Sequence, residues 1–460
     1  MAAPVDPFPT PEGPAPAAPL LPGTAPRRDR SLSKMVAYTW SRHWPAEMLM
    51  GVSGGVLGLT AFCLQRSLGA PEWTSPWLII LGQGLWLLAP AWPPLLAKMR
   101  HQTAFLWIGL FSRGPLLLMA FAAVTPTVVS GVGGGGTSGA QGTGAGTGSW
   151  WLLLVAYLVS NNLDALYTPH RNALLKANYP LTMRGRIYGW VTAITSLAAV
   201  VTANLVGRVL DHDPTAVRWI FPMSAVAGLA AHFGLARIRW RYDGPRHVQP
   251  GSGVAIVHHS LRDAAKATRR TIRTDRDFRD FEIGFMLYGL GLLSASPLIV
   301  TRFAQDATFS MAEWTTADRL VLPVTQLLLV PFVGRLSDRI GVVRVASLAF
   351  LSLVAYFLLM GLVANQWHLM GVNVLFGFCM AGVNVAWSLG PLHFAPPGKA
   401  HHYSSVHVAC VGVRSILGPL LGMGVMAAFS FEAALLVSAG LEVAAGLWMF
   451  RLARRVHIAA

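Results

Sequence analysis

The sequence predicts an all-α integral membrane protein with twelve transmembrane helices arranged in two six-helix bundles. Of its 460 residues, 53% are hydrophobic and only 12% are charged. A soluble domain cannot bury this much apolar surface. Several apolar runs approach the roughly 20 residues that cross the hydrocarbon core of a bilayer as a helix. A transmembrane barrel would instead show segments of about ten residues with alternating polarity, and the sequence has no such alternation.

Apolar runs separated by turn residues and charge clusters mark the individual spans. In order they cover residues 46–67, 75–97, 102–125, 150–172, 186–208, 216–236, 282–301, 316–334, 343–364, 367–390, 404–428 and 430–451. Nine prolines between Pro4 and Pro26 predict a disordered tail. We therefore divide the chain into a Pro-rich cytoplasmic tail (1–45), an N-terminal bundle (46–236), a basic cytoplasmic central loop (237–281) and a C-terminal bundle (282–455).

Lysine and arginine alternate along the chain in a way that predicts its orientation. The tail, the central loop and the connections on the same side as these carry 29 lysines and arginines, whereas the intervening connections carry five. Positively charged loops stay on the cytoplasmic side. We therefore expect a multi-pass protein of the cell membrane with both termini in the cytoplasm. The net charge of +16 is spread over many short loops, so it does not indicate nucleic-acid binding.

The most informative charged stretch is "GRLSDRIGVVRV", residues 334–345, between the eighth and ninth spans. Gly334 and Gly341 permit a tight turn. Asp338 can accept hydrogen bonds from a helix N-terminus or pair with an arginine, while Arg339 faces the anionic leaflet. Such a turn can act as a conformational latch between bundles. The alternative is a charged turn that only fixes topology.

This stretch resembles the Gly-x-x-x-Asp-Arg-x-Gly loop signature of the major facilitator superfamily. The six-plus-six arrangement of spans and the long basic central loop are similar to that family over residues 34 to 455. "NYPLTMRGRIYG" resembles the family's Arg-Gly-Arg turn through Arg184 and Arg186. The equivalent first-half turn, "LLAKMRHQTAF", lacks the aspartate and both glycines. The resemblance implies alternating access, in which two bundles rock about a site near the middle of the membrane.

Polar groups inside spans are the candidates for chemistry, because a buried charge there is costly unless it is paired or hydrated. Asp164 lies about 21 Å into the fourth span at 1.5 Å per residue, close to Asn161. It is a candidate proton carrier or cation site, or else a structural partner for an arginine on a neighbouring helix. Arg414, about 15 Å into the eleventh span, needs an anionic solute or an internal carboxylate such as Asp164.

Other residues within the spans are weaker candidates for a functional site. Asn384 and Trp387 in the tenth span are three residues apart, so they share a helix face that suits an organic solute, although asparagine also serves helix packing. Arg113 and Glu442 lie in spans that the resemblance makes peripheral, and we expect structural roles for both. The histidines in "GKAHHYSSVHVAC" and the three cysteines lack the spacing of a metal site. We expect no metal and no cofactor.

The function that this sequence predicts is secondary active transport of a small organic solute by alternating access, coupled to protons through Asp164. No Walker loop, nucleophile elbow or HExxH motif is present, so we do not expect an enzyme. The alternative is a transporter-like membrane sensor or assembly factor without turnover, which the degenerate first-half turn favours. We expect a monomer whose partners are the solute and the lipid bilayer.

Overall fold

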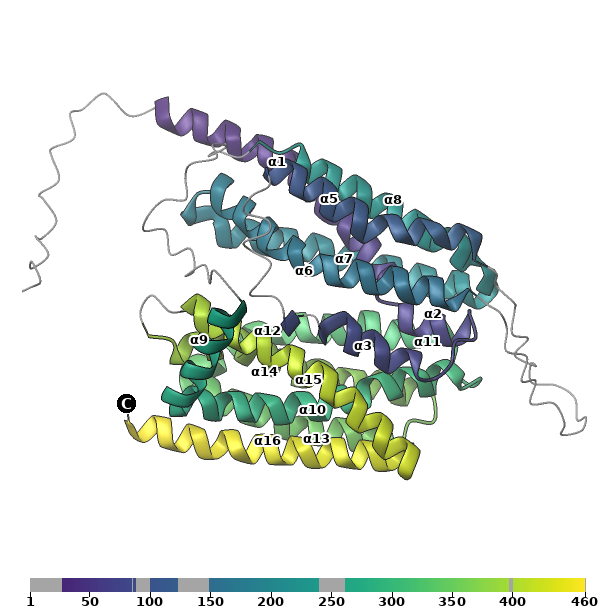
Figure 1. The fold of residues 1–460 in the computed structure, drawn as a ribbon, viewed down its shortest axis with the longest axis vertical. Coiled ribbons are helices and arrows are strands. Elements are labelled where there is room, and N and C mark those ends of the chain that lie inside the picture. The colour runs from purple at the N-terminus through teal and green to yellow at the C-terminus, as the bar shows by residue number, and fades with distance from the viewer. Residues whose placement is uncertain are drawn as a thin grey trace, which may run out of the picture.

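Long helices follow the apolar runs of the chain (Figure 1). The computed structural model describes residues 27–84, 86–87, 100–122, 149–239, 261–396 and 400–459. The first half contains α1 (Arg27–Leu57), α2 (Thr60–Arg66), α3 (Thr74–Gly84), α5 (His101–Arg113), the 3-10 helix η2 (Gly114–Phe121), α6 (Trp150–Asn178), α7 (Leu181–His212), the 3-10 turn η3 (Pro214–Ala216) and α8 (Val217–Ala236). The second half contains α9 (Leu261–Thr274), α10 (Arg276–Gln305), α11 (Met311–Thr316), the π-helical segment η4 (Ala317–Val321), α12 (Leu322–Ile340), α13 (Val342–Met360), α14 (Gln366–Phe394), α15 (Ala400–Ala428) and α16 (Phe431–Ala459).

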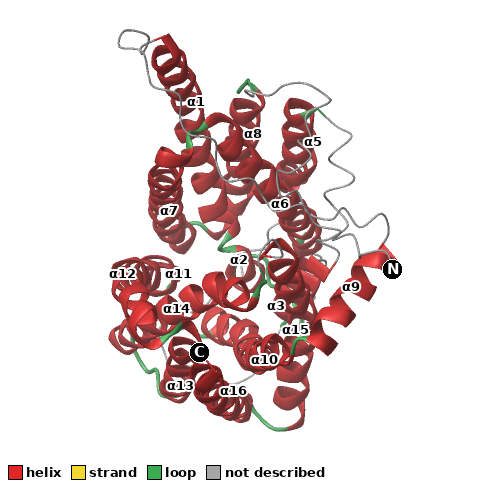
Figure 2. Ribbon diagram, turned by 90° about the vertical axis from the view of Figure 1, so that its left-hand side faces the viewer, coloured by secondary structure: helices red, strands yellow, loops and turns green. Residues whose placement is uncertain are grey.

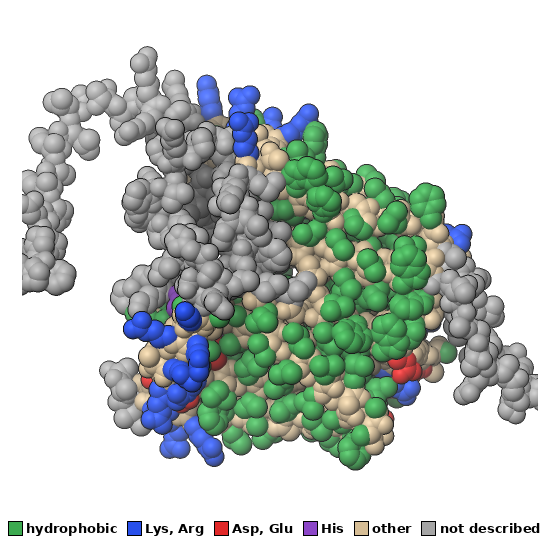
Figure 3. All heavy atoms as spheres, in the orientation of Figure 1, with side chains coloured by type: hydrophobic (Ala, Val, Ile, Leu, Met, Phe, Trp, Pro, Cys, Tyr) green, Lys and Arg blue, Asp and Glu red, His purple; other side chains and the backbone are tan. Residues whose placement is uncertain are grey.

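The described part of the chain consists of helices joined by turns and loops and contains no strand (Figure 2). Within it, 10 helical stretches are long and apolar enough to cross a membrane. Helix α6 covers the predicted fourth span, and α3 covers the first half of the predicted second span, of which residues 88–97 lie outside the described part; this is consistent with the expected order. Hydrophobic side chains cover the middle of the molecule, while lysine and arginine gather at its ends (Figure 3). This distribution is that of a multi-pass membrane protein, and it confirms the predicted fold class.

The helices form two bundles (Figures 1 and 2). In the N-terminal bundle α1 packs against α7 and α8, and α5 packs against α6 and α8. In the C-terminal bundle α10 packs against α15 and α16, and α13 packs against α14 and α16. Gly51 and Gly55 let α1 approach the backbone of α7 at Thr195 and Ala199, where any larger side chain would collide. Small residues four apart are a common way to bring two membrane helices together.

Two predicted boundaries differ from the structure. Helix α1 begins at Arg27, so residues 27–45 are helical and are not part of a disordered tail. From Arg27 to Leu57 the only proline is Pro45, so this segment can form a helix; residues 1–26 lie outside the described part. The central loop also contains a helix, α9, whose sequence lacks glycine and proline and has apolar residues on one side only.

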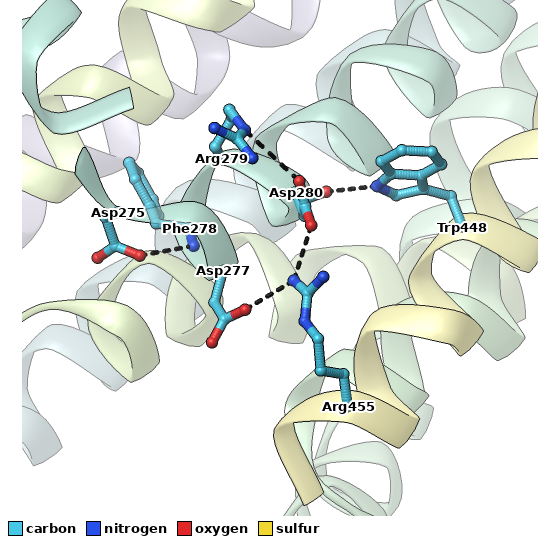
Figure 4. Close-up of polar contacts among 7 residues, drawn as sticks. All are labelled: Asp275, Asp277, Phe278, Arg279, Asp280, Trp448 and Arg455. Atoms are coloured by element: carbon cyan, nitrogen blue, oxygen red, sulfur yellow. Dashed lines mark hydrogen bonds and ion pairs between the residues drawn. The ribbon is translucent and has the colours of Figure 1, made fainter. Parts of the chain in front are cut away.

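Both ends of the described chain lie at the same end of the molecule, which we call the terminal face (Figure 1). There Arg455 of α16 donates hydrogen bonds to Asp277 (2.6 Å) and Asp280 (2.7 Å) of α10 (Figure 4). Trp448 Nε1 donates to the backbone carbonyl of Asp280 at 2.8 Å. Asp275 caps α10 by accepting a first-turn backbone N–H at 3.0 Å. These contacts fix the first turn of α10 on α16.

Candidate functional site

Asp164 of α6 pairs with Arg113 of α5 inside the N-terminal bundle. Arg113 Nη2 donates to the two carboxylate oxygens of Asp164 at 3.0 and 2.8 Å, and Arg113 Nη1 donates to Ser160 Oγ at 2.7 Å. The Arg113 side chain is 2% exposed and that of Asp164 is 30% exposed. The carboxylate therefore has a permanent cation as its partner, and the partner of Arg414 lies elsewhere.

The neighbouring asparagines of α6 face α3. Asn162 Nδ2 donates to the backbone carbonyls of Leu81 (3.0 Å) and Leu158 (2.7 Å), which ties the two helices together. The Asn161 side chain lies over Gly82, where the missing side chain leaves room for it. Asn161 is half-buried next to the half-buried Asp164, so these two candidates lie on one segment of α6.

A buried glutamate that the sequence analysis did not single out lies in the same bundle. Glu47 of α1 is 2% exposed and lies 2.5 Å from Arg171 Nε of α6. Tyr167 Oη donates to it at 2.8 Å and Thr195 Oγ1 at 3.2 Å, while His43 Nε2 lies 3.4 Å away. Because α1 begins at Arg27, Glu47 is deep in the helix. The predicted span began at residue 46, which made Glu47 a residue of the helix end.

Arg414 of α15 is buried among aromatic rings of the C-terminal bundle. It is 5% exposed, and its Nη1 donates to the backbone carbonyl of Phe285 at 2.5 Å. Its Cζ lies 5.2 Å from the ring centroids of both Tyr288 and Trp387. Its Nε is buried without a hydrogen-bond partner. Among the described residues no carboxylate lies within ion-pair distance of Arg414. Its positive charge is instead stabilised by the carbonyl of Phe285 and by the faces of the aromatic rings around it.

His407 lies two turns before Arg414 on α15 and pairs with Glu282 of α10. Its Nδ1 lies 2.9 and 3.1 Å from the two carboxylate oxygens, and the side chains are 3% and 4% exposed. The other ring nitrogen, Nε2, is buried without a hydrogen-bond partner in the described structure. The Trp387 ring lies 4.4 Å from the His407 ring. Trp387 thus contacts both His407 and Arg414.

Of the remaining predicted site residues, Asn384 lies apart from this cluster. It is exposed on α14 and makes no hydrogen bond to a described residue, while Trp387 is half-buried against α15. Glu442 of α16 is fully buried, and both of its carboxyl oxygens lack a hydrogen-bond partner in the described structure. Among described residues, no group of three or more His, Cys, Asp or Glu side chains is placed to hold a metal ion.

The predicted turn at residues 334–345 is shorter than the sequence suggested. Helix α12 continues through Gly334, Asp338 and Arg339 to Ile340, and Gly341 alone makes the turn with φ +88°. A positive φ of this size favours glycine. The side chains of Asp338 and Arg339 are exposed, and within the described chain Asp338 has no hydrogen bond or ion pair. The proposed latch contact is not made here.

The structure describes only part of two other predicted turns, the Arg-Gly-Arg turn and the first-half turn. Arg184 and Arg186 lie in the first turns of α7, and their side chains are outside the described structure. The first-half turn spans residues 95–105, and its residues 95–99 lie outside the described structure.

Polar contacts between the bundles gather at the end away from the terminal face, which we call the opposite face. Asp211, at the end of α7, accepts the backbone N–H groups of Met311 and Ala312 of α11, each at 2.7 Å. Arg319 Nη2 donates to the carbonyl of Gly58 at 2.7 Å, and Arg66 donates to the carbonyl of Phe309. Deeper in the molecule, Ser415 Oγ donates to Gln83 Oε1 at 3.1 Å.

Comparisons with known proteins identify the fold. Residues 281–459 match the family model of the Major Facilitator Superfamily. A search of curated proteins finds no match. Similar solved structures include a point mutant of the nucleoside transporter NupG, with a TM-score of 0.66, 11% identity and coverage of 92% of this chain and 99% of that one. A point mutant of the peptide transporter POT has a TM-score of 0.63, 13% identity and coverage of 92% and 97%. The human organic anion transporter MFSD10 has a TM-score of 0.53, 14% identity and coverage of 92% and 100%. The resemblance inferred from the sequence is confirmed.

Proposed function

We propose that this protein, whose residues 281–459 match the family model of the Major Facilitator Superfamily, is a secondary active transporter without enzymatic activity. It moves a small organic solute across the cell membrane by alternating access, coupled to protons. It works as a monomer with both termini in the cytoplasm. The exposed Arg269, Arg270 and Arg273 of α9 at the terminal face support that orientation.

The observation that carries the proposal is the placement of polar contacts between the bundles. Asp211, Arg319 and Arg66 join the bundles at the opposite face. At the terminal face, the exposed Asp338 has no partner among the described residues. Two bundles whose described polar contacts gather toward one end are suited to rocking, in which these contacts break and others form at the other end.

The solute site that we propose centres on Arg414 and Trp387, with Asn161, Asn384 and Asp164 as further candidates. A buried guanidinium cannot lose its charge, and a planar anionic group can accept from its free N–H groups. The Trp387 ring beside it offers an apolar wall for an organic group. A solute with one negative charge and a planar apolar part fits this pair of residues.

Asp164 stays a candidate for proton coupling, with a condition set by its partner. Its ion pair with Arg113 neutralises it without a proton. To carry a proton, Asp164 has to separate from Arg113 during the transport cycle. The variant Asp164→Asn tests this, because uptake would then lose its dependence on the pH gradient while expression persists.

The test of transport uses purified protein in liposomes with an imposed pH gradient. The solutes are uridine, alanyl-alanine, 5-aminolevulinic acid and benzenesulfonate, chosen from the nucleoside, peptide, 5-aminolevulinic acid and organic anion ligands named for the similar structures. We expect gradient-driven uptake of an anionic member, lost in Arg414→Ala. The control is Arg302→Ala, which removes an exposed arginine at the end of α10.

A sensor or assembly factor without turnover is the second candidate, favoured by the first-half turn that lacks the aspartate and glycines of its second-half counterpart. Flux and binding separate the two functions. Saturable binding that raises the thermal unfolding midpoint, without flux for any bound solute, would exclude transport. Sustained flux would exclude the sensor.

A further inference from the structure

Four acidic side chains of the described membrane helices differ in what neutralises them. Glu47 has Arg171 and Asp164 has Arg113, so both are paired with permanent cations. Glu442 has neither a hydrogen bond nor an ion pair in the described structure. Glu282 alone among these four pairs with a titratable group, His407, without an arginine as well, whereas Glu47 has Arg171 in addition to His43 at 3.4 Å.

The number of protons on the Glu282–His407 pair decides the net charge of this buried region. With one shared proton between Nδ1 and the carboxylate, neutral imidazole and carboxylate together carry one negative charge. A second proton, on His407 Nε2 or on the carboxyl group, makes the pair neutral. A net charge in a dry interior is costly, so a neighbouring charge determines which state is favoured.

That neighbouring charge is Arg414, two turns farther along the same helix. The two residues share Trp387, which lies 4.4 Å from the His407 ring and 5.2 Å from Arg414 Cζ. Arg414 makes no ion pair with a described residue, so its positive charge offsets the negative charge of the unprotonated pair. When no solute is bound, the Glu282–His407 pair and Arg414 together are therefore neutral without the second proton.

The other described groups that face this region leave its net charge unchanged. Cys410 and Tyr403 of α15 and Tyr288 of α10 are neutral side chains near neutral pH. Glu442 of α16 is counted as a neutral acid, because an unpartnered carboxylate in a buried site is highly unfavourable. From α14 the facing residue is Trp387, and from α13 it is Phe350, which stacks on Tyr288; neither titrates. Asp275 and Asp280 lie at the terminal face, bonded to Tyr403 and Arg455 respectively.

We infer that Glu282 and His407 form a coupling proton site, an alternative to the candidate Asp164, and that it binds one proton for each negative charge that a solute brings to Arg414. This inference rests on the proposed function. When an anion neutralises Arg414, the pair is left with an uncompensated negative charge, and it takes a proton from water on the open side. After the site opens to the other side and the anion leaves, that N–H or O–H bond breaks and the proton passes to water there. Anion and proton therefore bind cooperatively, which is the thermodynamic requirement for their joint transport.

The first test measures the proton directly and needs no solute. The variant Arg414→Gln removes the positive charge and so imitates an occupied site. Nitrogen-15 NMR of histidine rings in nanodiscs, with His407→Gln to assign the signal, reports the state of His407 near neutral pH. Infrared spectroscopy of the carboxyl band, assigned with Glu282→Gln, reports the state of Glu282.

In the wild type we expect His407 to be a neutral imidazole and Glu282 to be a carboxylate. In Arg414→Gln we expect one additional proton, on either His407 or Glu282. The matched variant Arg302→Gln, at an exposed arginine, should leave both signals as in the wild type. An identical proton content in the wild type and Arg414→Gln would overturn the inference.

The second test follows benzenesulfonate, a permanent anion, into liposomes. One proton entering with each anion makes uptake electroneutral, so wild-type uptake should not respond to membrane potential. Glu282→Gln should make it respond, and the control Glu442→Gln, another buried glutamate of the bundle, should not. A response to potential in the wild type contradicts the inference. Absence of benzenesulfonate uptake in the wild type counts against the proposed solute class, and the proton measurement then decides the coupling site by itself.

Discussion

Arg113 of α5 holds Asp164 of α6 in a two-bonded ion pair, at 3.0 and 2.8 Å, and uses its remaining Nη1 group on Ser160 of the same helix. The Arg113 side chain packs over Gly228 of α8, where a Cβ would meet Arg113 Cγ and Cδ at 2.8 Å. One arginine therefore links three helices of the N-terminal bundle. The bundle is expected to depend on this residue for stability as well as for any role of Asp164 in coupling.

Removing one partner of this pair should destabilise the protein. Asp164→Asn leaves a buried cation uncompensated, which typically costs about 3 kcal/mol of unfolding free energy when one partner of a buried pair is lost. The double variant Arg113→Met/Asp164→Leu should regain most of that loss. Thermal unfolding in detergent measures both. The control is Arg279→Ala, at a partly exposed arginine whose pair with Asp280 spans 3.6 Å, and it should shift the midpoint little. A single variant as stable as the wild type would refute the structural role.

The contact between Asp211 and α11 should set the balance between conformations. Asp211 caps the start of α11 in the other bundle, and replacing such a cap by alanine costs about 1 kcal/mol. Asp211→Ala should therefore move the population toward a state in which the opposite face opens and the terminal face closes. The control is Asp213→Ala, because Asp213 bonds Thr215 within its own bundle.

Spin labels at the terminal face can measure this shift. Labels at Ala37 of α1 and Arg339 of α12, both exposed, report the separation of the bundles. Cys63, Cys379 and Cys410 are first replaced by alanine. We expect shorter distances in Asp211→Ala than in Asp213→Ala. Equal distance distributions would show that this cap does not control the conformation.

The two glycines of the 334–345 stretch should respond oppositely to alanine. Gly341 has φ +88° and ψ 147°, a conformation that is essentially restricted to glycine, so Gly341→Ala should cost about 1–3 kcal/mol. Gly334 lies inside α12 with nothing within 4 Å of a built Cβ, so Gly334→Ala should be neutral or stabilising by up to about 1 kcal/mol. Thermal unfolding of both variants checks this, and similar losses in both would contradict it.

Asp306, in the connection between α10 and α11, should contribute to acid sensitivity. Burial tends to raise the pKa of Asp306, but hydrogen bonds from Thr308 Oγ1 (2.7 Å) and Thr308 N (2.9 Å) outweigh it and hold the pKa below its usual value. A lowered pKa gives stability that is present above the unfolded value of about 3.9 and is lost as the pH falls through the folded value. Asp306→Asn should therefore unfold with a smaller dependence on pH in the acid range. A curve parallel to that of the wild type would show no contribution.

The amino-acid sequence by itself determined the order of the membrane helices, the division into two halves and the turn at Gly341. Each of these depends on neighbouring residues: apolar runs of sufficient length, charge clusters between them, and one position that only glycine tolerates. It also located Asp164, Arg414 and Trp387 as polar or aromatic groups within spans.

Only the tertiary structure decided which charges meet. Asp164 pairs with Arg113, and Glu282 pairs with His407 from a helix 125 positions away in sequence. Glu47 became a buried residue only because α1 begins at Arg27 and places it against α6 and α7. Local periodicity gives the face of a helix but not its neighbour, since partners across a bundle are selected by packing between segments far apart in the chain. The chemistry of this protein resides in those pairings.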